Sequence, residues 1–249
     1  MRKGTNNRKR SALLAILSII PLGTVCSQSA TSPVVQTENI TNVSVILFAE
    51  QEAGIDPYPV RLLTSPDYVR IDDGYDESDY VLFDRRTHTV FSVSHDEHSI
   101  LEIRNHPFSG PLPSDLSLTE IPIVDKEAPT IAGKQPQQFE YLANGNTCYQ
   151  SISVSGLLDE AVAGMAEYAV ALGERQLNNM QSVPETMRTP CFLSRYVYAP
   201  GRHYTHGLPV QVWDDSGYNR SLTDFRTGET VRAALFSIPD NYERMLLGE

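Results

Sequence analysis

Two short clusters of acidic and histidine side chains are the parts of this sequence whose residue types are suited to metal chemistry. "DDGYDESD" covers residues 72–79 and "HDEH" covers residues 95–98. Carboxylate oxygens are the ligands that calcium prefers, and imidazole nitrogens are common zinc ligands. The first question is whether these clusters bind metal or are turns between strands.

The acidic cluster does not have the spacing of a calcium-binding loop. An EF-hand loop needs oxygen ligands at its first, third and fifth positions, glycine at the sixth and a carboxylate at the twelfth. When the loop is counted from Asp72, Gly74 and Phe83 occupy the third and twelfth positions, and counting from Asp73 also fails. We therefore predict a solvated turn at residues 72–79.

The histidines form two pairs, His95 with His98 and His203 with His206. Zinc needs three or four convergent ligands on rigid supports, and one tight turn supplies at most a pair. If the two pairs met in space they would form a site, so a metal-dependent envelope enzyme is kept as an alternative. The sequence contains no H-E-x-x-H, C-x-x-C, G-x-S-x-G or phosphate-binding glycine motif. We expect no catalytic residues, no metal and no cofactor.

The N-terminus has the features of an export signal. "MRKGTNNRKR" carries five positive charges and no acid, and an apolar run at 12–25 precedes small polar residues. We interpret residues 1–27 as a signal peptide, because the apolar run is too short to span a bilayer comfortably. Lipid anchoring through Cys26 is the alternative. Ordinary cleavage near Ser27 or Ser29 is favoured, since it fits the small-residue preference better.

The charge that remains after cleavage limits the possible partners. Removing residues 1–27 takes away five positive charges, so the net charge changes from −11 to −16. Such an acidic chain repels phosphate backbones and anionic lipid surfaces, which excludes nucleic acid as an expected partner. No second long apolar run follows, so we expect a soluble periplasmic protein that is monomeric, with at most peripheral contact to the envelope.

If the protein is exported, its two remaining cysteines, Cys148 and Cys191, are in an oxidising compartment. In an oxidising compartment such an even pair predicts a disulfide, and free thiols are the alternative. In the chain-entropy model, closing this loop would stabilise the fold by about 4 kcal/mol. Neither cysteine has a nearby histidine in sequence, so a catalytic thiol is not indicated.

Most of the remaining chain is typical of short antiparallel strands. Residues 28–41 are polar and without periodicity, which predicts a tether, and 42–249 suits a single domain. At residues 68–71, apolar and polar side chains alternate, which favours strands with one solvated face. Runs rich in Val, Ile, Phe and Tyr predict strands at 43–50, 59–65, 68–71, 79–84, 88–94, 99–103, 119–124, 138–143, 148–155, 191–199, 208–215, 220–226 and 231–238.

A different period appears at residues 156–180, where apolar residues recur at alternating steps of four and three. This spacing predicts one long amphipathic helix. Its apolar stripe consists of Leu158, Val162, Met165, Ala169 and Leu172. A single helix among many strands must bury that stripe against the sheet, so we predict an α+β fold, mainly β, with the sheet curled around the helix. The five stripe residues are the predicted ligand-binding residues of an apolar cavity.

The segment at 68–103 resembles a stretch shared by periplasmic proteins of the LolA-like superfamily, which contains lipoprotein carriers and uncharacterised exported families. Later residues that carry the resemblance are Ile131, Ala132, Gly133, Phe139, Cys148 and Tyr149, with "GLPVQVWDDSG" and "LFSIPDNYERM" near the end. The resemblance implies a half-open antiparallel barrel wrapped over helices, with an apolar cavity for acyl chains and no catalytic residues. The long helix and the cysteine pair depart from the lipoprotein carriers.

The expected function is therefore an exported binding protein that holds a lipid, an acyl chain or a lipidated partner protein. Two alternatives stay open at this point. One is the metal-dependent envelope enzyme that uses histidine and acidic residues. The other is a ligand-free structural or interaction domain of the envelope.

Overall fold

The computed structural model describes residues 38–247 except 105, 106, 108, 109 and 126. The chain divides into two units, Met1–Gln36 and Thr37–Glu249, and the described residues belong to the second. The predicted signal peptide, Cys26 and residues 28–37 of the predicted tether lie outside the described part. Strand β1 begins at Asn39, so residues 39–41, which were predicted to belong to a tether, are part of a strand.

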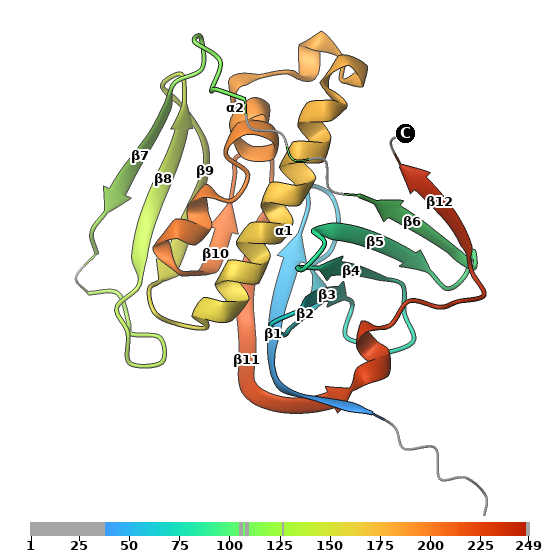
Figure 1. Ribbon diagram of the computed structural model, residues 1–249. Coiled ribbons are helices and arrows are strands. Elements are labelled where there is room, and N and C mark those ends of the chain that lie inside the picture. The colour runs from blue at the N-terminus through green and yellow to red at the C-terminus, as the bar shows by residue number, and fades with distance from the viewer. Residues whose placement is uncertain (1–37, 105–106, 108–109, 126, 248–249) are drawn as a thin grey trace, which may run out of the picture. The chain divides into compact units, whose positions relative to one another are not determined.

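The fold is mainly β, with one long helix and an open sheet of twelve strands (Figure 1). The strands are β1 (Asn39–Gln51), β2 (Tyr58–Thr64), β3 (Tyr68–Asp72), β4 (Tyr80–Asp84), β5 (Thr89–Ser94), β6 (Ser99–Ile103), β7 (Leu118–Ile123), β8 (Gln137–Ala143), β9 (Asn146–Val154), β10 (Leu208–Trp213), β11 (Asn219–Arg232) and β12 (Glu243–Leu247). The predicted class is confirmed at this level.

The sheet consists of two meanders of consecutive strands. Strands β1 to β6 form one and β7 to β11 form the other, and β1 pairs with β11 to join them. All neighbouring strands are antiparallel except β12, which pairs in parallel with β6 at one edge. Strand β7 forms the other edge. The pairing of β1 with β11 thus places residues near both ends of the described chain side by side.

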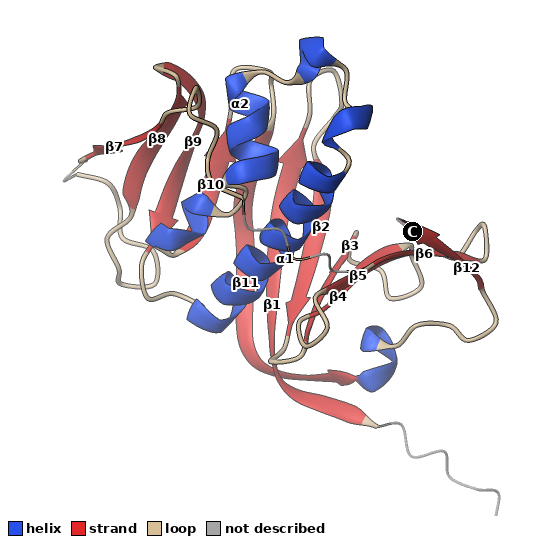
Figure 2. Ribbon diagram, turned by 45° about the horizontal axis from the view of Figure 1, so that its top comes forward, coloured by secondary structure: helices blue, strands red, loops and turns tan. Residues whose placement is uncertain are grey.

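Helix α1 (Asp159–Asn178) lies across one face of the sheet, over β2, β3 and β5 (Figure 2). Asp159 and Glu160 occupy its first turn and Arg175 its last, as the helix dipole favours. Val162 and Met165 pack against Leu62 and other buried residues of the sheet. The predicted helix is present, but of its predicted stripe only Val162 and Met165 are buried, while Leu158 and Ala169 are partly buried and Leu172 is exposed. Within the described residues, no helix is long and apolar enough to cross a bilayer.

The expectation that β3 has one solvated face is wrong. Val69 faces α1, but Arg70 on the opposite face is only 2 % exposed. The 3-10 helix η5 (Ala233–Phe236) covers that second face, and Arg70 donates a hydrogen bond to the Leu235 carbonyl at 2.8 Å. Its guanidinium group also lies 3.9 Å from the centre of the Tyr80 ring. Alternation of polar and apolar residues therefore reflects a buried cation here, not solvent.

The strand expected at 191–199 is instead helical. Thr189 caps helix α2 (Pro190–Leu193) by accepting a hydrogen bond from the Phe192 amide, and Pro190 occupies the first turn. A five-residue π-helical turn, η3 (Ser194–Tyr198), follows directly. Threonine before proline is a helix-start signal that outweighs the β-propensity of the aromatic residues after it. The run at 231–238 likewise ends β11 and then forms η5.

Candidate functional site

The predicted disulfide between Cys148 and Cys191 is confirmed, with their Cα atoms 5.1 Å apart. Cys148 belongs to β9, near one end of the sheet, and Cys191 belongs to α2. The bond therefore ties the helical segment 190–198 to the sheet. A disulfide of this kind is compatible with an exported protein.

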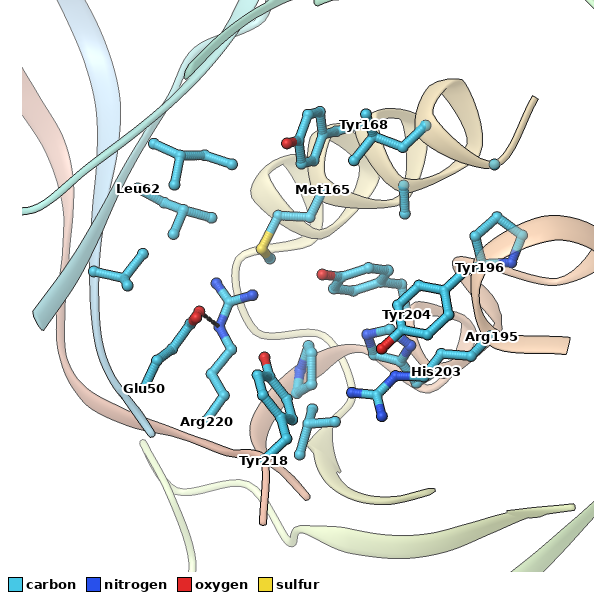
Figure 3. Close-up of a pocket in the computed structure, with 18 residues that line it drawn as sticks. Glu50, Leu62, Met165, Tyr168, Arg195, Tyr196, His203, Tyr204, Tyr218 and Arg220 are labelled. Atoms are coloured by element: carbon cyan, nitrogen blue, oxygen red, sulfur yellow. Dashed lines mark ion pairs between the residues drawn. The ribbon is translucent and has the colours of Figure 1, made fainter. Parts of the chain in front are cut away.

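A pocket of about 420 Å³ lies between α1, the sheet and the segment that follows the disulfide (Figure 3). One part of its lining is aliphatic: Val60, Leu62, Ile71, Met165, Ala169 and Leu172. The polar and aromatic lining residues include Glu50, Tyr168, Arg195, Tyr196, His203, Tyr204, Tyr218 and Arg220. The pocket thus combines an apolar wall with a polar end.

Three of the five stripe residues of the helix contribute to this pocket. Met165, Ala169 and Leu172 line it, and Leu172 is exposed. Val162 is buried in the main core cluster and Leu158 packs against that cluster, so neither lines the pocket. The first two turns of α1 therefore fill the core, while its later turns border open volume. Ligand binding by these residues stays a prediction.

The polar end contains an arginine and a glutamate that sequence analysis did not identify. Arg220 Nε lies 3.2 Å from Glu50 Oε1 in an ion pair, although the two atoms are not aligned as a hydrogen bond. The Arg220 guanidinium also stacks 3.9 Å from the centre of the Phe48 ring. Glu50 and Arg220 face each other in the register of β1 and β11. No local pattern marks such a long-range pair.

Arg195 reaches the pocket from the π-helical turn η3, a kind of turn that often occurs at functional sites. Its guanidinium forms an ion pair with Asp214. It also lies between two aromatic rings, 4.9 Å from the centre of Tyr149 and 5.0 Å from that of Tyr218. These contacts hold the cation at the pocket wall. Because residues 191–199 were predicted to be a strand, there was no reason in the sequence to place Arg195 at a site.

His203 is the other unusual group of the pocket. It lies in the 3-10 helix η4 (Arg202–His206), and its buried Nδ1 atom has no hydrogen-bond partner among the described residues. Burial, followed by the positive charges of Arg220, Arg195 and Arg202, lowers the pKa of His203 to about 3. The ring is therefore neutral at ordinary pH, and its Nδ1 atom is buried without a partner in the described part of the chain.

The two histidine pairs do not meet. His95 Nδ1 lies 2.7 Å from the Tyr242 hydroxyl, beside β5 and β6 near one edge of the sheet. His206 stacks on Phe139 of β8 near the other edge, with ring centres 3.7 Å apart. Across the described ranges, no group of three or more His, Cys, Asp or Glu side chains is arranged to hold a metal ion.

The acidic segment at 72–79 is a turn between β3 and β4 that is mostly exposed, as predicted, except that its first residue belongs to an ion-pair network. Asp72 is buried, which corrects the prediction for this residue. It accepts hydrogen bonds from Arg61 Nε at 2.8 Å and from Arg70 Nε at 2.6 Å. Asp76 pairs in turn with Arg61 and with Arg232 of β11. The two carboxylates thus neutralise the buried Arg70, the largely buried Arg61 and the half-exposed Arg232.

Comparisons with known proteins assign no family. No family model matches the chain, and no curated protein matches it. Among solved structures, two crystal forms described as PNGF-II are similar over 83 % of this chain, with a TM-score of 0.40 and 9 % identity. The match spans 31 % of one of those chains and 32 % of the other, which is about a third of their length.

Proposed function

We propose that this chain is an exported binding protein whose pocket holds an acyl chain or another aliphatic part of a lipid or a lipidated partner. The observation that carries the proposal is a pocket of about 420 Å³ that has aliphatic walls from two elements of the fold. One wall comes from the sheet through Val60, Leu62 and Ile71, and the other comes from later turns of α1. Small-molecule pockets are usually of this size and mostly apolar.

Two further points support the proposal. The resemblance to LolA-like proteins implies a sheet that acts as a half-open barrel around the helix, with the cavity between them. The disulfide suits the periplasm, where a free aliphatic ligand needs a carrier because water solvates it poorly. A protein with this role needs no catalytic residue and no metal.

The proposal is tested by substituting a larger side chain at a helix position that lines the pocket. Ala169→Trp places an indole in the pocket, while Val170→Trp adds the same group at the next, exposed position outside the lining. Binding is measured with phenylnaphthylamine, an apolar dye whose fluorescence rises in apolar surroundings. Circular dichroism shows that each variant is folded.

We expect saturable dye binding to the wild-type protein and to Val170→Trp, displaced by dodecan-1-ol. Ala169→Trp should lose the dye while keeping its unfolding midpoint close to that of Val170→Trp. If the wild type binds no dye and Ala169→Trp is strongly destabilised, the pocket is closed by packing in solution. That result would leave a ligand-free structural domain.

A further inference from the structure

At the polar end of the pocket, several buried polar atoms have no hydrogen-bond partner within the described part of the chain. His203 and Arg220 both line the pocket, and each has a buried nitrogen without a hydrogen-bond partner among the described residues. Arg202 Nε, Tyr149 Oη and Ser194 Oγ are also buried without an aligned hydrogen bond to any described residue, although these residues do not line the pocket and Arg202 lies near the Tyr149 hydroxyl group. The Tyr149 ring lies 5.7 Å from the His203 ring, and the Arg202 guanidinium lies 5.7 Å from the centre of the Tyr149 ring, so these three groups lie close together. Buried polar atoms left unpaired in this way are uncommon in folded proteins.

All five of these atoms can donate a hydrogen bond. Arginine nitrogens can only donate, whereas the hydroxyl groups and the imidazole nitrogen can donate or accept. A ligand that brings acceptor oxygens can therefore pair with any of them, while a ligand that brings only N–H donors leaves the arginines unpaired. The chemistry of the cluster favours an acceptor-rich group.

Charge favours the same kind of group. Arg195 and Arg220 are paired with Asp214 and Glu50, but Arg202 forms no ion pair within the described part of the chain. Its Nη2 atom instead donates to the Leu142 carbonyl at 3.3 Å. Burial is the main cause of the lowered pKa of His203, and the positive charges of these three arginines add to it. Since two of the arginines are paired with carboxylates, Arg202 supplies the positive charge near this end of the pocket that no carboxylate of the described residues neutralises. An anion at this end of the pocket would be attracted.

We infer that the ligand is an aliphatic chain ending in an anionic oxygen group, a carboxylate or a phosphate, which binds at His203 and Arg220. The inference rests on the proposed function, since the aliphatic wall must take the chain. Figure 3 shows both parts of this arrangement in one pocket, with Met165 above the Arg220 and Glu50 pair. The head group would share Arg220 with Glu50, so the glutamate competes with the ligand.

This competition predicts opposite effects for two substitutions that each remove a charge. Arg220→Gln removes the cation and should weaken binding of an anionic amphiphile by at least about tenfold, as expected for a lost charged hydrogen bond. Glu50→Gln frees Arg220 from its partner and should strengthen binding of the same ligand. Arg226→Gln, at an exposed position of the same strand, is the matched control for the change in net charge.

The experiment measures displacement of phenylnaphthylamine by four ligands that share one chain: dodecanoate, dodecyl phosphate, dodecan-1-ol and dodecylamine. Each is used below its critical micelle concentration with the wild type and the three variants. We expect dodecanoate or dodecyl phosphate to bind the wild type at least about tenfold more tightly than the alcohol. Whichever of the two anions binds better identifies the head group. The alcohol should bind Arg220→Gln and the wild type equally.

Equal displacement by the alcohol and both anions would overturn the anionic head group and leave the proposed function intact. A preference for the amine would do the same, as would an Arg220→Gln protein that matches Arg226→Gln. If none of the four amphiphiles displaces the dye, or the dye itself does not bind, the proposed function fails and this inference fails with it.

Discussion

Arg85, in the turn after β4, holds Glu167 of α1 through two parallel hydrogen bonds. Arg85 Nε lies 2.7 Å from Oε2, and Nη2 lies 2.8 Å from Oε1. Arg85 Nη1 also donates to the Ser65 carbonyl at 3.1 Å, so one guanidinium group links the helix to two turns of the sheet. This bidentate contact fixes the rotation of α1, and with it the direction in which the pocket-lining side chains point.

Glu167→Gln should therefore loosen the helix. The carboxylate is partly exposed, so we expect only about 1 kcal/mol of lost unfolding free energy. Urea denaturation provides the measurement. Glu174→Gln on the same helix is the control, because Glu174 forms no ion pair within the described residues. Equal midpoints for the two variants would mean that the contact does not hold the helix.

Asp72 should make the fold sensitive to acid. Burial alone would raise its pKa, but hydrogen bonds from Arg61, Arg70 and the Gly74 amide outweigh that effect and lower it. A lowered pKa in the folded state stabilises the protein above the unfolded value of about 4, and this contribution is lost as the pH falls through the folded value. Asp72→Asn should cost about 3 kcal/mol at neutral pH.

The measurement is the free energy of unfolding of wild type and Asp72→Asn from neutral pH to below pH ~4. The difference between them should shrink as the pH falls, because the wild-type carboxylate becomes protonated. Asp73→Asn, at the exposed neighbouring position, should behave as wild type throughout. A difference that stays constant with pH would contradict the role given to the charge.

The disulfide should stabilise the fold, because it lowers the conformational entropy of the unfolded chain. It should also help to position Arg195. We expect the Cys148→Ser, Cys191→Ser double variant to be less stable than wild type by about 4 kcal/mol. Intact mass after denaturation with an alkylating reagent and no reductant should show no added label on the wild-type pair. Two added labels would show free thiols and remove this contribution.

Gly207 precedes β10 and is expected to tolerate no side chain. Its φ is +101°, and a Cβ atom there would lie 2.3 Å from the Val154 carbonyl oxygen. Gly207→Ala should lower the unfolding free energy by about 3 kcal/mol, since backbone strain and a steric clash add. Gly54→Ala is the control, because Gly54 also has a positive φ but has no atom within 4 Å of a Cβ. The control should lose only about 1 kcal/mol.

The sequence predicted those parts of the fold that local patterns determine. The strands around 68–103 and the long helix follow from alternation, turn residues and a helical period, which act over a few positions. The helix at 190–198 was missed because Thr189 and Pro190 signal its start while Tyr196, Val197 and Tyr198 favour a strand. Strand β12 was missed because its apolar residues pair only with β6 and remain exposed.

The candidate site was predictable only on its helical side. Met165 and Ala169 belong to a stripe that a helical period reveals. Glu50 and Arg220 come together only when β1 pairs with β11, and that register depends on contacts that no local pattern encodes. His203 was visible as a residue type with metal chemistry, but its burial among arginines depends on the tertiary fold.

The seam between β1 and β11 also determines the order in which the molecule can fold. Strand β1 completes its pairing with β2 early in the chain, but its other edge stays open until β11 has been synthesised. Pairings such as Ile46 with Phe225 close very long loops, and contacts of this kind slow folding. An incomplete chain therefore displays a long, apolar strand edge, which is the kind of edge that pairs with other chains. This edge of β1 stays open until residues 219–232 are available to form β11.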